Sequence, residues 1–312
     1  QSLSDPRLPL FNRATSGVYN PGSTVKPVVG IAALEEGIAV PSDRFFSSGA
    51  LELPNPYAPD KPSRFLDWKA HGWVNLAGAI ARSSNVYFYY VGGGFKDVRG
   101  LGVERLRRYY ALFGFGEPTG IELPNEASGS LPSPEEKERR SGTPWRIGDT
   151  YNVSIGQGDL AITPLELLNA IASIVNGGTL YRTTIVAGKS REVLRDYAHL
   201  APRMREVLFG MRDAVYESYG TAHLLADIPL PIVGKTGSAQ VLQNTKTNAF
   251  FVGCAPVAAK TRGAVGIVTG SVEPICLLVL VENAREGSMN TTPVARDVFR
   301  WYAERAASSN TR

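Results

Sequence analysis

A serine and a lysine lie three residues apart near the start of the chain, in the segment Gly22-Ser-Thr-Val-Lys-Pro27. If a helix begins here, Ser23 and Lys26 share one of its faces. A serine hydroxyl becomes a good nucleophile only when a base takes its proton, and a lysine is a base only while neutral. Burial and the positive end of a helix both favour the neutral amine. The pair predicts a serine nucleophile with a lysine base; a capping serine beside an exposed lysine is the alternative.

A second polar group, Ser-Ser-Asn at positions 83–85, separates two apolar segments. The Ser83 hydroxyl could relay a proton to a leaving amine. The Asn85 amide could hydrogen-bond a substrate amide and the Lys26 amine. By itself a Ser-Asn pair is an ordinary turn between helices, so a plain turn is the alternative.

A third group, Lys235-Thr-Gly237, lies inside a run of strand-forming residues. A glycine within a strand lets another backbone approach, and an edge strand here could pair with an extended peptide. Lys235 and Thr236 would then hold a terminal carboxylate by charge and hydrogen bonding. A strand followed by a turn is again the alternative.

Apolar periodicity and helix start and stop residues predict the elements that must position these groups. We expect helices over residues 24–36, 75–81, 86–91, 103–113, 163–176, 202–216 and 292–307, and strands over 232–241, 249–254 and 275–281. Residues 38–72 are expected to be loops with short extended pieces, and residues 116–150 a second proline-rich loop region. The long connection 257–273 is expected to hold an extra hairpin or be mobile. Helices followed by strands and a last helix indicate an α+β fold with an antiparallel sheet.

Composition narrows the class of protein. The chain has 312 residues, 43% of them hydrophobic, which is enough for a large core. The net charge of +4 comes from interspersed charges of both signs, so nothing favours a nucleic-acid partner. Three His and two Cys without metal-ligand spacing lead us to expect no metal and no cofactor. The longest apolar runs are too short to span a bilayer, and no signal peptide is recognisable.

Together the three groups follow the order Ser-x-x-Lys, Ser-x-Asn, Lys-Thr-Gly. In this order the chain resembles the transpeptidase domains of penicillin-binding proteins, and most closely the class B, elongation-type penicillin-binding protein 2. The resemblance runs from about residue 8 to the C-terminus. Its motifs lie at residues 9–14, 17–27, 67–72, 120–124, 153–158, 163–164, 220–222 and 234–239.

The resemblance implies a reaction. Ser23 would attack the penultimate D-Ala carbonyl of a peptidoglycan stem peptide, with Lys26 as general base, and D-Ala would leave. Ser83 and Asn85 would shuttle the proton and position the substrate. An amine of a neighbouring stem peptide would then resolve the acyl-enzyme into a crosslink. β-Lactams would acylate the same serine because they mimic the D-Ala-D-Ala end.

The resemblance also implies how the substrate is held. Lys235, Thr236 and Gly237 would bind the terminal carboxylate and the peptide backbone. The backbone N–H groups of Ser23 and Ser238 would form the oxyanion hole.

The family's fold is an antiparallel central sheet flanked by helices, with an all-helical subdomain, which we expect here as a single domain over residues 1–312. In the family a strand hairpin precedes the Asn-Arg-Ala segment at positions 12–14, so we expect the domain to be incomplete at its N-terminus. A pedestal domain and a membrane-anchoring helix outside this chain would place the whole protein at the periplasmic face of the inner membrane. Its partners would be stem peptides, β-lactams, and a RodA-type glycan polymerase with other elongation-complex proteins that shape the cell.

Rival functions share parts of this pattern. A class A β-lactamase adds a carboxylate that activates water, and Glu166 followed by Asn169 has a suggestive spacing. Thr163-Pro164 starts a capped helix there, however, so we predict a structural role for Glu166. A β-lactam sensor would be acylated without turnover, and a D,D-carboxypeptidase would pass the acyl group to water. A non-catalytic scaffold would not be labelled at Ser23.

Three further residues support smaller predictions. If their strands are neighbours, Cys254 and Cys276 could face each other, and an extracytoplasmic location would permit a disulfide. Buried free thiols are the favoured prediction, because the sequence does not define the geometry. His71 is predicted to be a hydrogen-bonded loop residue instead of a substrate contact.

Overall fold

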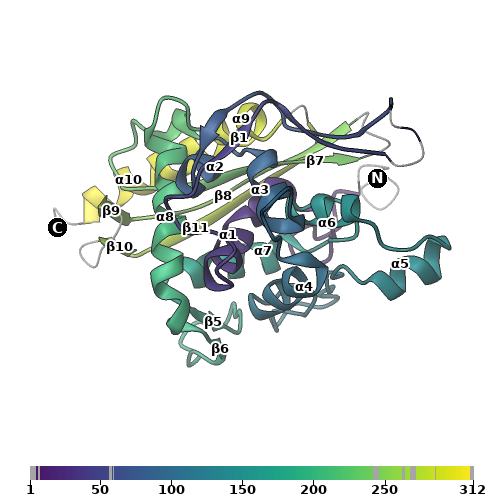
Figure 1. Ribbon diagram of the computed structural model, residues 1–312. Helices are drawn as coiled ribbons and strands as arrows, with labels where there is room; N and C mark the ends of the chain where they lie inside the picture. Colours follow the sequence, from purple (N-terminus) through teal and green to yellow (C-terminus); the bar gives the residue numbers. More distant parts are fainter. Residues whose placement is uncertain are drawn as a thin grey trace.

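A three-stranded antiparallel sheet lies at the centre of the protein. The computed structural model describes residues 5, 8–55, 58, 60–241, 246–261, 264–267, 272–284 and 286–309. The sheet consists of β7 (Val233–Val241), β8 (Lys246–Ala255) and β11 (Ile275–Ala284), in the order β11-β8-β7. Figure 1 shows helix α8 (Ala201–Tyr216) crossing in front of the strands.

The other elements range from strands of three residues to the 18-residue helix α10. The remaining α-helices are α1 (Lys26–Glu35), α2 (Leu76–Ala81), α3 (Asn85–Gly93), α4 (Gly102–Leu112), α5 (Pro134–Ser141), α6 (Ile147–Ser154), α7 (Pro164–Val175), α9 (Gly287–Asn290) and α10 (Thr292–Ser309). The 3-10 turns are η2 (Gly22–Val25), η3 (Ala198–Leu200) and η4 (His223–Leu225). Antiparallel pairs form between β1 (Phe45–Ser47) and β4 (Gly72–Val74), β2 (Ala50–Leu53) and β3 (Ser63–Leu66), β5 (Thr179–Tyr181) and β6 (Val193–Asp196), and β9 (Val257–Thr261) and β10 (Ala264–Ile267).

Alternate residues of β8 face two different hydrophobic cores. Phe250 and Val252 pack into the larger core, which includes the buried residues of α1, α3 and α7. Phe251 points the other way and packs with Phe299 of α10 in a smaller core. Because successive side chains of a strand alternate in direction, a strand covered on both faces reads as one apolar run.

Helix α1 runs through the larger core. Every residue from Lys26 to Leu34 is buried, as expected for a helix that is apolar on all sides. Lys26 is the one charged residue in that run. The helix therefore carries a lysine amine into the protein interior.

The α+β fold class and the predicted antiparallel sheet are confirmed, and the additional hairpin is present as β9–β10. Residues 262–263 and 268–271 of that connection lie outside the described residues. The helix predicted over 24–36 is in fact a 3-10 turn followed by α1, with Pro27 in the first turn of α1.

Helices α5 and α6 occupy a segment that was predicted to be loop. Helix α5 has a serine cap and a proline start but no buried residue, so the apolar periodicity that signals a helix is missing. In α6 half of the residues are buried, but the helix is short and the stretch before it is rich in proline.

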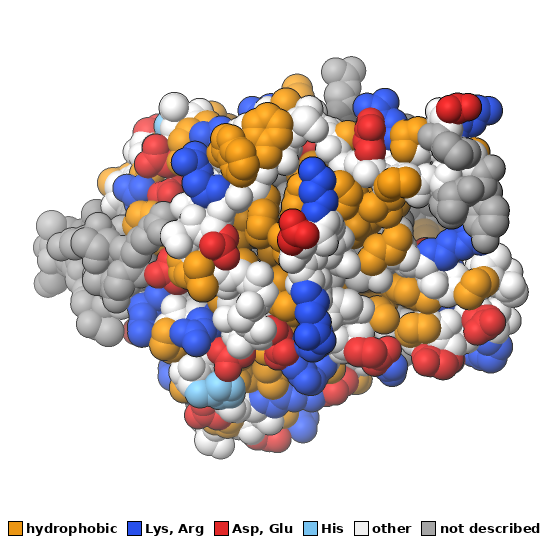
Figure 2. Space-filling model, in the orientation of Figure 1, with side chains coloured by type: hydrophobic (Ala, Val, Ile, Leu, Met, Phe, Trp, Pro, Cys, Tyr) orange, Lys and Arg blue, Asp and Glu red, His pale blue; other side chains and the backbone are white. Residues whose placement is uncertain are grey.

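Surface charge and helix composition add two observations. Acidic and basic side chains are interspersed over the face shown in Figure 2. Within the part of the chain that the structure describes, none of the helices has the length and apolar character that crossing a bilayer requires.

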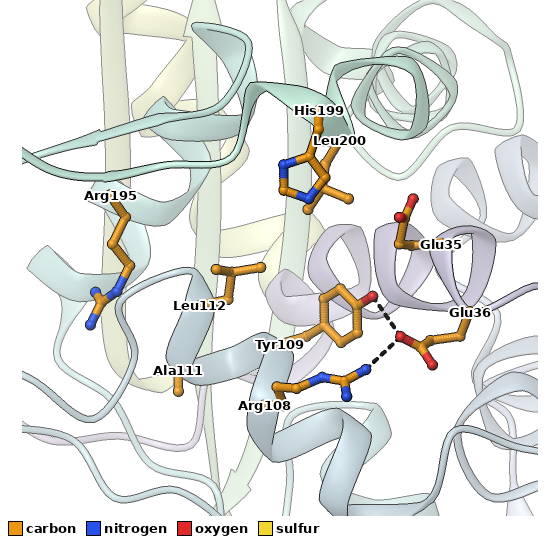
Figure 3. A pocket seen from close by; sticks show the side chains of 9 residues that line it. All are labelled: Glu35, Glu36, Arg108, Tyr109, Ala111, Leu112, Arg195, His199 and Leu200. Carbon is orange, nitrogen blue, oxygen red and sulfur yellow. Dashed lines mark hydrogen bonds and ion pairs between the residues drawn. The ribbon is translucent and has the colours of Figure 1, made fainter.

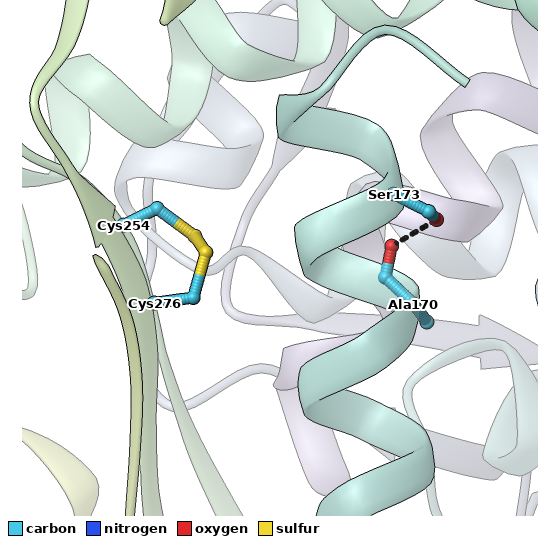
Figure 4. Close-up of a disulfide and its surroundings, with 4 residues drawn as sticks. All are labelled: Ala170, Ser173, Cys254 and Cys276. Carbon is cyan, nitrogen blue, oxygen red and sulfur yellow. Dashed lines mark hydrogen bonds between the residues drawn. A yellow bond between two sulfur atoms is a disulfide. The ribbon is translucent and has the colours of Figure 1, made fainter. Parts of the chain in front are cut away.

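The prediction of free thiols is wrong, because Cys254 and Cys276 form a disulfide. The register of the sheet places the two residues directly opposite each other on β8 and β11. Figure 4 shows the bridge projecting from these strands toward α7, the helix that carries Ser173. The pairing depended on strand register, which the sequence alone did not supply.

Removing this disulfide is expected to destabilise the protein by about 3 kcal/mol, because the bridge closes a loop of 22 residues and restricts the unfolded chain. The measurement is the free energy of unfolding of the Cys254→Ala, Cys276→Ala double variant in denaturant. Adding a reductant should destabilise the wild type by a similar amount and leave the double variant unchanged. Equal stability of all samples would contradict the prediction.

Candidate active site

Lys26 of the first sequence group and Lys235 of the third both contact Ser83 of the second. The Lys26 Nζ donates hydrogen bonds to the Ser83 carbonyl oxygen at 2.7 Å and to the Asn85 Oδ1 at 2.8 Å. It also lies 3.4 Å from the Ser83 Oγ. The Lys235 Nζ donates to the same Oγ at 2.8 Å. One serine therefore contacts both buried lysines, across 152 positions of sequence.

The backbone of Ser83 has an unusual conformation. Its φ is 57°, in the left-handed region that non-glycine residues rarely adopt, at a cost of about 1–2 kcal/mol. The turn is held by hydrogen bonds from the Ser83 N–H to Ile80 and from the Ser84 N–H to Ala79. Strained residues fixed in this way concentrate at functional sites.

Ser23 lies in η2, just before α1. It is partly exposed, while Gly22 and Thr24 on either side are buried. The Lys26 N–H donates to the Ser23 carbonyl, so the two residues belong to one continuous helical turn.

Close backbone contacts hold η2 against the sheet. A Cβ on Gly22 would lie 2.5 Å from the Ser238 carbonyl oxygen, and one on Gly237 would lie 2.7 Å from the Thr24 Cγ2. A Cβ on Gly237 would also lie 3.0 Å from the Pro21 carbonyl oxygen, so another backbone does approach this glycine, as predicted. On the other side, the Gly22 N–H donates to the Gly156 carbonyl at 2.9 Å.

Burial controls the charge of both lysines. Desolvation lowers the pKa of Lys26 to about 7, although the Asp67 carboxylate partly opposes this effect. Desolvation also lowers the pKa of Lys235 well below its usual range, and the nearby Lys26 adds to the effect. At neutral pH a substantial fraction of Lys26 amines can therefore accept a proton.

The sequence groups did not include Asp67, which is buried beside α3. Its Oδ1 accepts a hydrogen bond from the Asn85 N–H at 2.9 Å, and its Oδ2 accepts one from the Ser84 hydroxyl at 2.7 Å. Burial opposes ionisation of this carboxyl, but the neighbouring His71 ring and the Lys26 ammonium hold its pKa below the usual range. Only the motif at residues 67–72 pointed to it in the sequence.

His71 lies beside Asp67 and is buried. Its Nε2 is 3.5 Å from the Asp67 Oδ1. The His71 backbone N–H donates to the Ser47 carbonyl at 3.1 Å. The ring contacts the Asp67 carboxylate and favours its ionisation, which agrees with the prediction of a hydrogen-bonded loop histidine.

Two other residues missed by the sequence groups contact β7. The Thr236 Oγ1 donates to the Thr221 Oγ1 at 2.7 Å. The Gln157 Nε2 donates to the Ser238 carbonyl at 3.3 Å. The Ser238 hydroxyl itself accepts a hydrogen bond from the Gly287 N–H at 2.9 Å. Thr221 and Gln157 lie in the motifs at 220–222 and 153–158, which were the available signal.

A pocket of about 620 Å³ lies at the far end of α1. Figure 3 shows Glu36 there, accepting hydrogen bonds from Arg108 and from the Tyr109 hydroxyl. Ten residues of helix, or about 15 Å, separate this end of α1 from Lys26. None of the predicted site residues lines the pocket, so the chemistry belongs to the Ser83 cluster.

The antiparallel sheet and this cluster define an α+β protein with a buried serine–lysine site. A sequence model described as "Penicillin binding protein transpeptidase domain" matches residues 1–299. The chain belongs to the penicillin-binding protein transpeptidase domain family.

Individual relatives agree with this assignment. The chain is 34% identical to the peptidoglycan D,D-transpeptidase MrdA of Haemophilus influenzae, over 96% of this chain and 46% of that protein. It matches the penicillin-binding protein 2 of Pseudomonas aeruginosa in complex with WCK 5153 with a TM-score of 0.79 at 31% identity, covering 96% of this chain and 64% of the other. It matches a complex between penicillin-binding protein 2 and MreC from Helicobacter pylori with a TM-score of 0.80 at 26% identity, covering 100% and 53%. The chain thus spans less than half the length of the MrdA relative.

Proposed function

We propose that this chain is a peptidoglycan D,D-transpeptidase domain. The Ser23 Oγ attacks the penultimate D-Ala carbonyl of a stem peptide, an ester bond forms, and the terminal D-Ala leaves as a free amine. Lys26 takes the Ser23 proton, and Ser83 passes a proton to the leaving nitrogen. An amine of a second stem peptide then attacks the ester, which releases Ser23 and forms the crosslink.

The observation that carries this proposal is the buried, hydrogen-bonded amine of Lys26. A pKa of about 7 suits a base that works near neutral pH. Its contacts with Ser83 and Asn85 place a proton relay beside it. The alternative prediction was an exposed lysine beside a capping serine. Such a lysine would not be buried and would not hydrogen-bond Ser83 and Asn85.

The sheet supports the proposed mode of substrate binding. Among the described strands β7 lies at one edge of the central sheet, so an extended peptide can add beside it. Lys235 and Thr236 at this edge would bind the terminal carboxylate, together with Gly237. The N–H groups of Ser23 and Ser238 would face the developing oxyanion.

The first test is the intact mass of the protein after incubation with benzylpenicillin, followed over hours and mapped by digestion. A lasting adduct on Ser23, absent from a Ser23→Ala variant, is expected. Rapid loss of the adduct with release of hydrolysed drug would identify a β-lactamase instead. No adduct on a protein with folded circular dichroism would reject the proposal.

A second test separates a transpeptidase from a sensor or a D,D-carboxypeptidase, which also form the adduct. The protein is incubated with a stem pentapeptide ending in D-Ala-D-Ala and with an excess of an acceptor stem tetrapeptide. A product with the summed mass of both peptides minus D-Ala is expected. Loss of D-Ala alone would indicate a carboxypeptidase, and no turnover would indicate a sensor.

Glu166 does not favour the β-lactamase alternative. Its two carboxylate oxygens accept hydrogen bonds from the backbone N–H groups of Gly129 and Thr163, at 2.7 and 3.1 Å. The second bond is half of a capping box at the start of α7, so the predicted structural role is confirmed. Burial raises the pKa of Glu166 to about 7.

Replacing Glu166 by alanine is expected to destabilise the protein by about 2 kcal/mol, because one buried and one partly buried N–H group lose their acceptor. Chemical denaturation measures this loss. The lifetime of the penicillin adduct should not change. Glu135, exposed in the first turn of α5, offers a matched control whose replacement should leave stability nearly unaltered. An adduct that lasts much longer in Glu166→Ala would assign the carboxylate to deacylation.

In its full-length protein, we propose that this single domain acts outside the cytoplasm, held by an N-terminal membrane anchor. The disulfide supports this, since such bonds persist in oxidising compartments. The similar penicillin-binding protein 2 of Helicobacter pylori forms a complex with MreC. We propose an MreC-type protein and a RodA-type polymerase as partners of the whole protein, to be tested by titrating purified partners against the full-length protein.

A further inference from the structure

The site contains two buried amines and a buried carboxylate next to them. Lys26 and Lys235 are fully buried and share the Ser83 hydroxyl. Two like charges this close oppose each other's ionisation. Asp67 is the carboxylate that acts in the other direction on Lys26, and its own ionisation is favoured by the same interaction.

Asp67 also holds the first turn of α3. The N–H groups that begin a helix have no partner within it. Asp67 reaches them from outside the helix: its Oδ1 accepts from the Asn85 N–H at 2.9 Å and its Oδ2 from the Val86 N–H at 3.1 Å. Ser84 and Ser47 donate their hydroxyl protons to the same Oδ2, at 2.7 and 3.0 Å. The carboxylate thereby joins β1, its own loop and α3.

The residue that Asp67 fixes is the one that binds the proposed base. Asn85 is the first residue of α3, and its side-chain Oδ1 accepts the hydrogen bond from Lys26. Its Nδ2 donates to the Leu66 carbonyl at 3.2 Å, beside Asp67 in the chain, which sets the orientation of the amide. Asp67 thus acts on Lys26 through Asn85.

We propose that Asp67 is a positioning residue for acylation of Ser23: its buried carboxylate fixes the start of α3, holds Asn85 against the Lys26 amine, and interacts with the positive charge of Lys26 when that amine is protonated. The inference rests on the proposed function. It assigns a role outside the Ser-x-x-Lys, Ser-x-Asn and Lys-Thr-Gly groups.

The expected pH dependence follows from the charges that face this carboxylate. Lys26 on α1 is the charged group; the His71 ring on the loop before β4 and the neutral Tyr89 phenol on α3 also lie near it, and Lys235 on β7 interacts with Lys26. Lys26 must be neutral to accept a proton, so acylation falls as pH drops below its pKa of about 7. Without the negative charge of Asp67 the pKa of Lys26 decreases. The decline of the acylation rate on the acidic side of its pH profile, the acid limb, must therefore move to lower pH.

The test measures the second-order rate constant for acylation by a fluorescent penicillin from about pH 5 to about pH 9, for the wild type and Asp67→Asn. The variant should have a plateau about tenfold lower, because Asn85 is less well held, and an acid limb about 0.5–1 unit lower. Asp67→Glu keeps the negative charge. Its acid limb should return to the wild-type pH, whereas its plateau rate should recover less completely. A folded Asp67→Asn with the wild-type limb would overturn the inference.

Ser47→Ala keeps the inference falsifiable if Asp67→Asn fails to fold. The Ser47 hydroxyl belongs to β1 and contacts this cluster through Asp67. Its removal leaves the carboxylate charged but less well held, so the plateau should fall about threefold with the limb unmoved. A wild-type plateau in this variant would overturn the inference. If the wild type itself is not labelled at Ser23, the proposed function fails and this inference fails with it.

Discussion

Replacing Lys26 by alanine is expected to lower the rate of Ser23 acylation about 10³-fold, the usual contribution of a positioned general base. The side chain is fully buried, and its amine bonds the Ser83 carbonyl and the Asn85 amide. Water at this position could not replace a base held in one orientation. The measurement is the second-order rate constant for penicillin acylation, with circular dichroism to show that the fold is kept.

The wild-type rate should have an acid limb centred near pH 7, because acylation needs the neutral amine and the pKa of Lys26 is about 7. The sign is fixed: protonation below this pKa removes the base, so activity falls as pH falls. The limb should disappear in Lys26→Ala. Lys61→Ala, at an exposed lysine, serves as the matched control and should behave as the wild type. A folded Lys26→Ala that is labelled at the wild-type rate would rule out Lys26 as the base.

Replacing Gly156 by alanine is expected to cost about 3 kcal/mol of stability and to slow acylation about 10²-fold. Gly156 has a φ of 78°, and a Cβ here would lie 2.1 Å from the Gly22 carbonyl oxygen. The atoms nearest this Cβ position are backbone atoms of Gly22, so no flexible side chain can move aside to relieve the clash. The turn that carries Ser23 must therefore shift, and small displacements of a nucleophile have large effects on rate.

Gly37→Ala is the matched control for this prediction. Gly37 also has a positive φ, of 62°, but nothing lies within 4 Å of its would-be Cβ. It should lose only about 1 kcal/mol, from backbone conformation alone, with acylation unchanged. Equal stability losses in the two variants, or unchanged acylation in Gly156→Ala, would show that the contact with Gly22 does not position Ser23.

Local patterns in the sequence predicted the longer helices and the three strands of the central sheet. Helix α7 was predicted from the Thr163-Pro164 start and the Gly177-Gly178 end, and its capping box is present. Strands β7, β8 and β11 were predicted from their Val, Ile and Phe content. The observed bounds differ from the predicted ones by at most three residues. Such signals are readable because they depend on residues that are near one another in the chain.

The sequence also determined which side chains are available for catalysis: a serine with a lysine three positions later, and two further polar groups. The tertiary structure decided which of these polar groups come into contact. Lys235 and Ser83 meet across 152 positions, and Cys254 faces Cys276 only because of the register of β8 and β11. Asp67 accepts a hydrogen bond from the N–H at the start of α3, 18 positions later in the chain. No periodic pattern in the sequence predicts this contact. Helical and strand periods are properties of neighbouring residues, whereas burial and the low pKa of Lys26 arise only when distant segments pack and exclude water.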